Sequence, residues 1–233
     1  MKLLAIETSG KLCGAAISED NNIIDKKELD NGLTHSESLM PLIKELLAKN
    51  NMKISDFDAF VCDIGPGSFT GIRIGVATAK AFVDSTSNAQ YTGVSSLEAL
   101  AYNVNKVGYV CSVIDCKNDN CYFALYLIEN NKYLEIIEPT AASILEMFES
   151  LKDCTNKPIT FVGDGVIAYK NQIINSIPNA KFVDEDLNKI NTSNLALAGF
   201  NRLSNGNVLE LSPLYLKKPQ AQRLLEEKEN NAN

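Results

Sequence analysis

The residues best suited to chemistry in this sequence form one glycine-rich segment. It runs Gly65-Pro66-Gly67-Ser68-Phe69-Thr70-Gly71-Ile72-Arg73-Ile74-Gly75, between a buried apolar run and a helical pattern. Glycines at a helix start let backbone N–H groups face an anion. The segment is not a P-loop, because Ile72 follows Gly71 where lysine is required. It is not a dinucleotide fingerprint either, because Thr70 stands at the third glycine position. The pattern therefore favours a packing role over a phosphate cradle.

The spacing within this segment gives a second interpretation. Small residues recur every four positions, which places them on one face of a helix where two backbones can approach closely. The stripe packs either against the protein's own sheet or against a second subunit, and its apolar flanks favour the subunit. On this interpretation, Gly75→Arg abolishes pairing and leaves the monomer folded. The expected partner-binding residues are Gly67, Phe69, Thr70, Gly71, Ile72, Gly75, Val76 and Ala79.

Candidate catalytic side chains are scarce. His35 is the only histidine, so the chain can assemble neither a two-histidine metal site nor a conventional hydrolase triad. The cysteines at 111, 116 and 121 are spaced five apart, which suits zinc poorly. We therefore predict no catalytic residue and no metal site. Thr8 and Ser9, after the first expected strand, are the candidate nucleotide-binding residues, and the simpler interpretation is that they are polar turn residues.

Composition excludes several classes of protein. The chain has 233 residues, is 45% hydrophobic and carries a net charge of -7. It has no apolar stretch near the roughly 20 residues that cross a bilayer. A negative chain repels a phosphate backbone, so direct binding of nucleic acid is not expected. The early Glu7 argues against a secretion signal, and we expect a cytoplasmic protein that does not bind membranes.

The elements that position these residues follow one order twice. Hydrophobic periodicity, turn residues and capping boxes predict β-β-β-α-β-α-β-α in each half. In the first half we expect strands at 3–6, 13–18, 23–29, 59–64 and 90–94 and helices after Thr34, at 68–83 and after Ser95. In the second half we expect strands at 109–115, 121–128, 132–137, 159–162 and 181–183 and helices at 141–150, 166–175 and 194–203.

This layout is that of an α/β protein with a duplicated ribonuclease-H-like fold, as in the actin-like ATPase superfamily. We expect two subdomains. Residues 1–104 form the N-terminal one, which is expected to carry the dimerisation surface, and residues 105–217 form the C-terminal one. A charged tail, 218–233, follows. Fold alone does not give function.

Five segments carry a resemblance to a known family. They are Ala5-Ile6-Glu7-Thr8-Ser9, Thr34-His35-Ser36, the glycine-rich segment 65–75, Gly93-Val94-Ser95-Ser96-Leu97 and Tyr215-Leu216-Lys217. On these residues the chain resembles the TsaB family, also called YeaZ. The resemblance implies a non-catalytic scaffold subunit that binds TsaD and supports the threonylcarbamoyl transfer forming N6-threonylcarbamoyladenosine at position 37 of tRNA.

The resemblance also implies the partners and cofactors. In that family TsaD carries the two-histidine metal site, and TsaE joins with its own ATPase. The helix after Gly65-Pro66-Gly67 forms the packing surface in both a TsaB homodimer and a TsaB–TsaD heterodimer. We therefore expect TsaD and TsaE as partners, a homodimer in isolation, and tRNA contact only through the complex. No intrinsic cofactor is expected, with ATP and Mg²⁺ at the complex through TsaD and TsaE.

One loop departs from the family pattern. The second half carries Asp115-Cys116-Lys117 and Asp119 where the family often has Asp-Ala-Arg and a glycine, which leaves the function of this loop open. The alternative function is a free-standing small-molecule kinase of the actin-like fold. It would use Thr8 and Ser9 near phosphate and Asp115 with Mg²⁺.

Overall fold

The first half of the chain forms a five-stranded sheet in the order β3-β2-β1-β4-β5. The computed structural model describes residues 1–30 and 34–217, so the expected charged tail 218–233 lies outside the described residues. β1 pairs antiparallel with β2 and parallel with β4, so an antiparallel meander continues into parallel strands. The strands are β1 (Lys2–Glu7), β2 (Cys13–Glu19), β3 (Asn22–Leu29), β4 (Ala59–Asp63) and β5 (Gln90–Val94).

The second sheet repeats this topology in the order β10-β9-β6-β7-β8, which is the first order read from the other edge. Its central strand β6 pairs antiparallel with β7 and parallel with β9, as β1 does with β2 and β4. The predicted duplicated fold is therefore confirmed. The strands are β6 (Gly108–Asp115), β7 (Asn120–Glu129), β8 (Lys132–Ser143), β9 (Ile159–Val162) and β10 (Ala180–Phe182).

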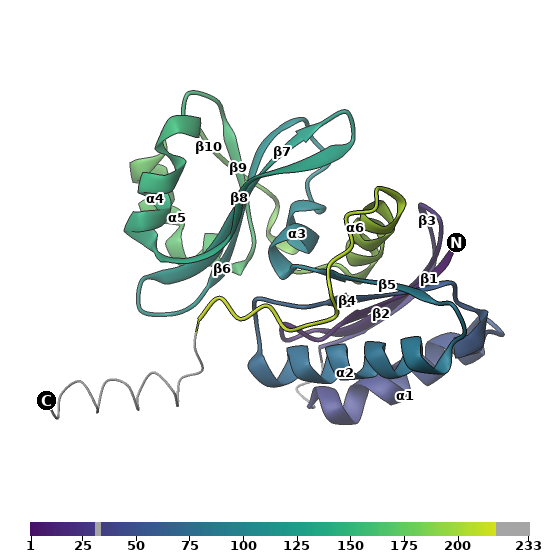
Figure 1. Ribbon diagram of the computed structural model, residues 1–233. Helices are drawn as coiled ribbons and strands as arrows, with labels where there is room; N and C mark the ends of the chain where they lie inside the picture. Colours follow the sequence, from purple (N-terminus) through teal and green to yellow (C-terminus); the bar gives the residue numbers. More distant parts are fainter. Residues whose placement is uncertain (31–33, 218–233) are drawn as a thin grey trace, which may run out of the picture.

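Helices cover both sheets, and the two halves exchange one helix each (Figure 1). α1 (His35–Lys49) and α2 (Phe69–Ser85) lie on one face of the first sheet, and α4 (Ile144–Leu151) and α5 (Asp164–Ser176) lie on the second. α6 (Thr192–Ser204), from the second half, packs on the other face of the first sheet. α3 (Ser96–Ala101), from the first half, packs on β6 and β7. The exchange interlocks the halves.

After α6 the chain returns to the first sheet. The Gly93 N–H donates to the Leu209 carbonyl at 2.8 Å, and the Leu214 N–H donates to the Ile64 carbonyl at 2.7 Å. Residues 209–214 therefore run beside the end of β4 and along β5. The expected division into subdomains 1–104 and 105–217 stays a prediction.

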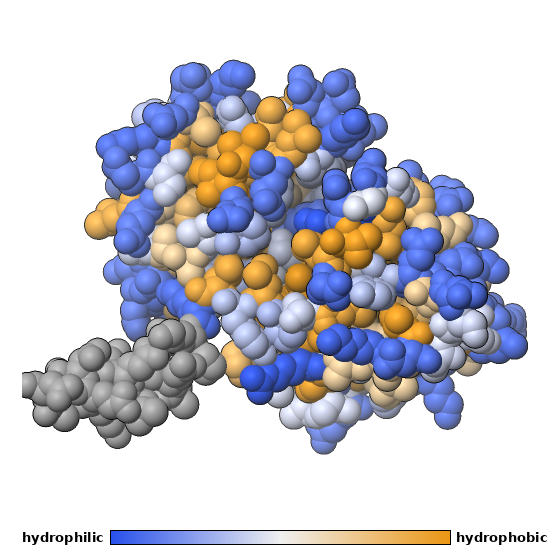
Figure 2. Space-filling view, viewed as in Figure 1, coloured by the Kyte–Doolittle hydropathy of each residue, from blue (hydrophilic) through white to orange (hydrophobic). Residues whose placement is uncertain are grey.

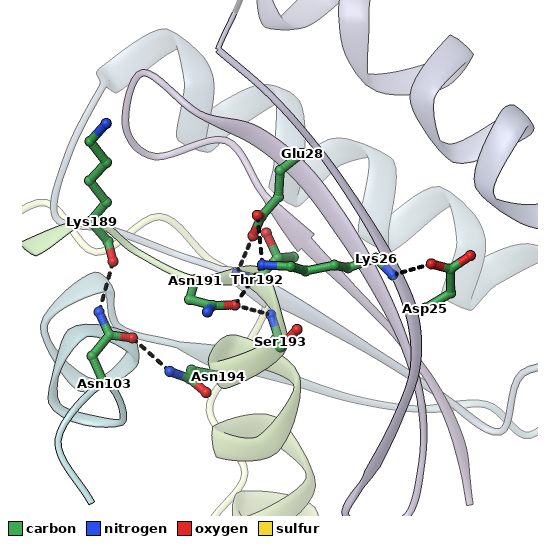
Figure 3. Close-up of polar contacts among 9 residues, drawn as sticks. All are labelled: Asp25, Lys26, Glu28, Asn103, Lys189, Asn191, Thr192, Ser193 and Asn194. Atoms are coloured by element: carbon green, nitrogen blue, oxygen red, sulfur yellow. Dashed lines mark hydrogen bonds and ion pairs between the residues drawn. The ribbon is translucent and has the colours of Figure 1, made fainter. Parts of the chain in front are cut away.

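The start of α6 is fastened to the edge strand β3 by polar side chains (Figure 3). The Thr192 N–H donates to Glu28 Oε1 at 2.9 Å, and Lys26 Nζ lies 2.7 Å from Glu28 Oε2. Burial alone would raise the pKa of Glu28, but the bonds from Lys26 and Thr192 outweigh burial and lower it. The carboxylate therefore stays charged at the positive end of the helix. Asn194 Nδ2 also donates to Asn103 Oδ1, at 2.7 Å, just beyond α3.

Most element boundaries agree with the sequence predictions, and two are wrong. The strand expected at 132–137 continues to Ser143, so the helix expected from residue 141 begins at Ile144. The Ser143 N–H donates to Glu146 Oε2 at 2.7 Å, so a capping box sets the helix start there. The remaining short helices are 3₁₀ turns: η1 (Ile54–Asp56), η2 (Lys152–Cys154) and η3 (Glu185–Asn188). Within the described part of the chain, no helix is long and apolar enough to span a bilayer.

Candidate functional site

The small-residue stripe of α2 faces the protein's own first sheet. A Cβ added at Gly71 would lie 2.0 Å from the backbone oxygen of Thr8. A Cβ added at Gly75 would lie 2.4 Å from Thr8 Oγ1 and 3.2 Å from Cys62 Sγ. Thr8 Oγ1 also donates to the Gly71 carbonyl at 2.8 Å. The glycines therefore allow a close approach within the chain, between α2 and the end of β1.

The apolar flanks of the stripe are also internal. Ile72 is 1% exposed, Val76 is 5% exposed and Ala79 is fully buried, all in the core between α2 and the sheet. The interpretation of the stripe as a free apolar patch is therefore corrected, and so is the expectation that Gly75→Arg leaves the monomer folded. Gly67 and Thr70 are exposed and Phe69 is half-buried. Whether a partner contacts any of the eight predicted residues stays a prediction.

The outward face of α2 carries residues that sequence reasoning missed. Arg73, Ala77 and Lys80 are exposed, on the side opposite the stripe. The signal was available in the sequence, because Ile72, Val76 and the small residues together fill one helix face and leave positions 73, 77 and 80 on the other. Any surface that α2 offers to another molecule therefore includes these three residues.

Two carboxyl groups meet where β1 and β4 end. Glu7 is 1% exposed and Asp63 is fully buried. Ser9 Oγ lies 2.7 Å from Glu7 Oε1 and 3.0 Å from Asp63 Oδ2, and Ser96 Oγ donates to Asp63 Oδ1 at 2.7 Å. Burial, followed by the charge of Asp63, raises the pKa of Glu7 well above its usual range, and burial also raises the pKa of Asp63. The pair therefore holds a proton more readily than two separate carboxylates.

The predicted nucleotide-binding residues lie beside this pair. Thr8 and Ser9 are both buried, and their hydroxyl groups are hydrogen-bonded within the chain. Ser9 lines a cleft of about 410 Å³ between the two halves, opposite Ile114 and Asp164. The cleft has two cationic side chains, Lys11 and Lys189, and its acidic side chains are Glu7, Asp30, Asp164, Glu185 and Asp186. This charge suits a polyphosphate poorly. Nucleotide binding by Thr8 and Ser9 stays a prediction.

The loop after β6 is stabilised by its own aspartate. Asp115 Oδ1 accepts hydrogen bonds from Tyr169 Oη at 2.7 Å and from the Lys117 N–H at 2.8 Å, and Asp115 also forms an ion pair with the Lys117 ammonium. Burial alone would raise the pKa of Asp115, but these bonds outweigh burial and lower it. Asp115 is thus charged, and its contacts fix the loop. Lys117, Asn118 and Asp119 all have positive φ, a conformation that glycine adopts more easily.

His35 also makes an internal contact. Its Nε2 donates to the Gly10 carbonyl at 2.9 Å, which ties the start of α1 to the loop after β1. Across residues 1–30 and 34–217, no group of three or more His, Cys, Asp or Glu side chains is arranged to hold a metal ion.

The buried carboxyl pair predicts how stability depends on pH. We expect Glu7→Gln to match the wild type in free energy of unfolding near pH 4.5 and to exceed it at alkaline pH. The glutamine amide replaces the proton of Glu7, whereas in the wild type stability is lost as the pH rises from the ordinary Glu value of 4.5 toward the raised pKa. The difference should approach about 1.4 kcal/mol per unit of the shift. Urea unfolding across this range measures it.

The exposed Glu129 offers a matched control. Glu129→Gln should leave the free energy of unfolding unchanged at both ends of the range, because the substitution lies at the exposed surface. If Glu7→Gln and the wild type differ by the same amount at every pH, Glu7 and Asp63 do not share a proton.

Comparisons with known proteins agree with this fold. Residues 31–230 match the family model "TsaD: tRNA N6-adenosine threonylcarbamoyltransferase". A Bacillus subtilis protein named tRNA threonylcarbamoyladenosine biosynthesis protein TsaB is 29% identical over 78% of this chain and 80% of its own length. A Haemophilus influenzae protein of the same name is 25% identical over 93% of this chain and 94% of its own length.

Solved structures support the architecture. YeaZ from Pseudomonas aeruginosa superposes with a TM-score of 0.72 at 21% sequence identity, covering 92% of this chain and 99% of that structure. A second Pseudomonas aeruginosa structure, described as similar to peptidase YeaZ, gives a TM-score of 0.74 at 21% identity, covering 93% of this chain and 99% of that structure. At this identity the two structures support the fold alone. Because the family model spans most of the sequence, the chain belongs to the TsaD family, in which its relatives are TsaB (YeaZ) proteins.

Proposed function

We propose that this chain is a non-catalytic subunit that binds TsaD and supports threonylcarbamoyl transfer to tRNA. The observation that carries the proposal is that a chain of the TsaD family has a single histidine. It therefore lacks the two-histidine metal site that the resemblance assigns to TsaD. The names of the relatives supply the pathway, the biosynthesis of threonylcarbamoyladenosine in tRNA.

The charge of the chain supports an indirect relation to tRNA. Its net charge is -7, and a phosphate backbone is bound mainly by Lys and Arg. We infer that tRNA is contacted through the complex, that TsaE joins this complex, and that ATP and Mg²⁺ act there through TsaD and TsaE. The chain is proposed to act in the cytoplasm, because the pathway proposed for it modifies tRNA.

The partner surface is proposed to be the outward side of α2 with its surroundings. Figure 2 shows this side of the molecule, where hydrophilic and hydrophobic residues are interspersed over α2. A mixture of this kind is typical of the surfaces through which separately folded subunits pair. Phe69 at the helix start stacks on Tyr215, with ring centroids 4.4 Å apart, so two of the segments that carry the family resemblance meet at this surface.

Light scattering after size exclusion tests the pairing. Alone, this chain is expected to elute as a homodimer. Mixed with TsaD from the same organism, it should elute as a one-to-one heterodimer that replaces the homodimer. Ala77→Arg should keep the fold and prevent pairing, because it puts a long charged side chain on the outward face of α2. The matched control is Leu145→Arg, on α4, where the side chain is 74% exposed. Loss of pairing in both variants, or in neither, would contradict this placement.

The alternative of a free-standing kinase is not favoured by the site, because the hydroxyl groups of Thr8 and Ser9 and the carboxylate of Asp115 are hydrogen-bonded within the chain. Thermal melting with and without Mg-ATP separates the two functions. A ligand at 100 times its dissociation constant would stabilise the fold by about 2.7 kcal/mol, and we expect no shift.

A further inference from the structure

Arg73 is held in one place by two aromatic rings. Its guanidinium carbon lies 4.1 Å from the centre of the Phe69 ring and 5.7 Å from the centre of the Tyr215 ring. Its Nε donates to Tyr215 Oη at 2.7 Å. The two rings are themselves stacked, with 19° between their planes. Contacts of this kind order an arginine before any partner arrives, so less side-chain freedom is lost on binding.

Among the described residues, no ion pair neutralises the charge of Arg73. Arg73 is exposed, and across residues 1–30 and 34–217 no carboxylate lies within ion-pair distance of it. The first turn of α2 contains no acidic residue. The hydrogen bond to Tyr215 uses Nε and leaves the two Nη groups to form the fork that binds a carboxylate through two parallel bonds.

A second cation follows on the same outward face. Lys80 is two helical turns beyond Arg73, a rise of about 10.5 Å, and the small exposed Ala77 lies between them. This spacing fits a partner helix that presents acidic side chains two turns apart and packs closely at Ala77.

We propose that Arg73, ordered by Phe69 and Tyr215, is the residue through which α2 binds a carboxylate on a helix of its protein partner. This anchor rests on the proposed function, in which that partner is TsaD. Lys80 takes the second acidic side chain. Tyr215 acts as a positioning residue, because it fixes Arg73 rather than contacting the partner's carboxylate. The segment Tyr215-Leu216-Lys217 therefore contributes to partner binding although it lies far from α2 in the sequence.

Calorimetric titration with TsaD from the same organism tests this anchor. Arg73→Gln keeps a stem over Phe69 and removes the charge, and we expect it to weaken the affinity about tenfold or more at low salt and less at high salt. Tyr215→Phe keeps the stacked ring and removes the hydrogen bond, and we expect a loss of about threefold. Lys170→Ala is the matched control. Lys170, on the distant helix α5, is also an exposed cation, and it lies over the ring of Phe182. The Lys170→Ala variant should bind TsaD with the same affinity as the wild type.

The outcomes separate the two proposals. If wild-type chain binds TsaD and Arg73→Gln binds equally well, the anchor is wrong and the proposed function stands. If the wild type does not bind TsaD, both fail. If Arg73→Gln weakens the affinity for TsaD by the same factor at low and high salt, the anchor is also wrong. The effect of losing an ion pair must depend on salt. Melting curves of each variant, unchanged from the wild type, confirm that the fold is intact.

Discussion

Gly75→Arg is expected to prevent the chain from folding, whereas Ala77→Arg, two residues later in the same helix, should leave the fold intact. Any side chain at position 75 begins 2.4 Å from Thr8 Oγ1 and 3.2 Å from Cys62 Sγ, so arginine would force α2 away from β1 and β4. Overpacking combined with a buried charge costs more than about 4 kcal/mol, a large part of the stability of a typical domain. Circular dichroism and the soluble yield after expression measure the difference.

A milder variant keeps this prediction measurable by equilibrium unfolding. Gly71→Ala adds a single methyl group 2.0 Å from the Thr8 backbone oxygen, which cannot move as a flexible side chain can. We expect a loss of about 3 kcal/mol, against less than about 0.5 kcal/mol for the exposed Ala77→Ser. A Gly75→Arg protein with a wild-type melting curve would show that the stripe does not face the sheet.

Arg202→Met should strongly destabilise the fold at the exchanged helices. The Arg202 guanidinium on α6 contacts Glu98 Oε2 on α3 at 2.7 Å, and its Nη1 donates to the Asn207 carbonyl at 3.0 Å. The Glu98 side chain is 9% exposed, so removing Arg202 leaves a buried carboxylate without its counter-ion. Breaking such a pair from one side costs about 3 kcal/mol or more. Urea unfolding at neutral pH measures the loss.

The pH dependence and a double variant identify the cause. Burial raises the pKa of Glu98, Arg202 opposes that rise, and without Arg202 the pKa should rise further. Stability of Arg202→Met should therefore fall as the pH rises above the ordinary Glu value of 4.5, because Glu98 must ionise. Combining Glu98→Gln with Arg202→Met should recover most of the stability. A double variant as unstable as Arg202→Met alone would mean that Arg202 acts through packing.

The sequence predicts the order of elements in this fold because each element is encoded locally. Apolar runs such as 59–64 are bounded by turn residues, and Thr34 and Ser95 cap helices where expected. The capping box at Ser143 and Glu146 is also a local signal, and it sets the start of α4 at Ile144, later than the expected residue 141. The exchange of α3 and α6 between sheets was not predictable in the same way, because no local pattern states which sheet an amphipathic helix will cover.

The site was predicted less well because its contacts join distant residues. Glu7 and Asp63 meet only because β1 and β4 pair in parallel, and Phe69 meets Tyr215 only because residues 209–214 return along the first sheet. The glycine stripe was located correctly in the sequence, but its spacing alone does not say whether the close neighbour is a second subunit or the chain's own β1. Thr8, beside Gly71 and Gly75, supplies that answer in the folded chain.

Reconstituted tRNA modification tests the central claim most directly. TsaD and TsaE from the same organism, with tRNA, ATP, Mg²⁺ and the threonylcarbamoyl donor, should form threonylcarbamoyladenosine only when this chain is added, as seen by mass spectrometry of the released nucleosides. The folded variant Glu7→Gln should support the same yield, because under the proposed function the chain's own cleft takes no part in the chemistry. Equal yields with and without the chain, or a yield that is lost with Glu7→Gln, would contradict a scaffold function.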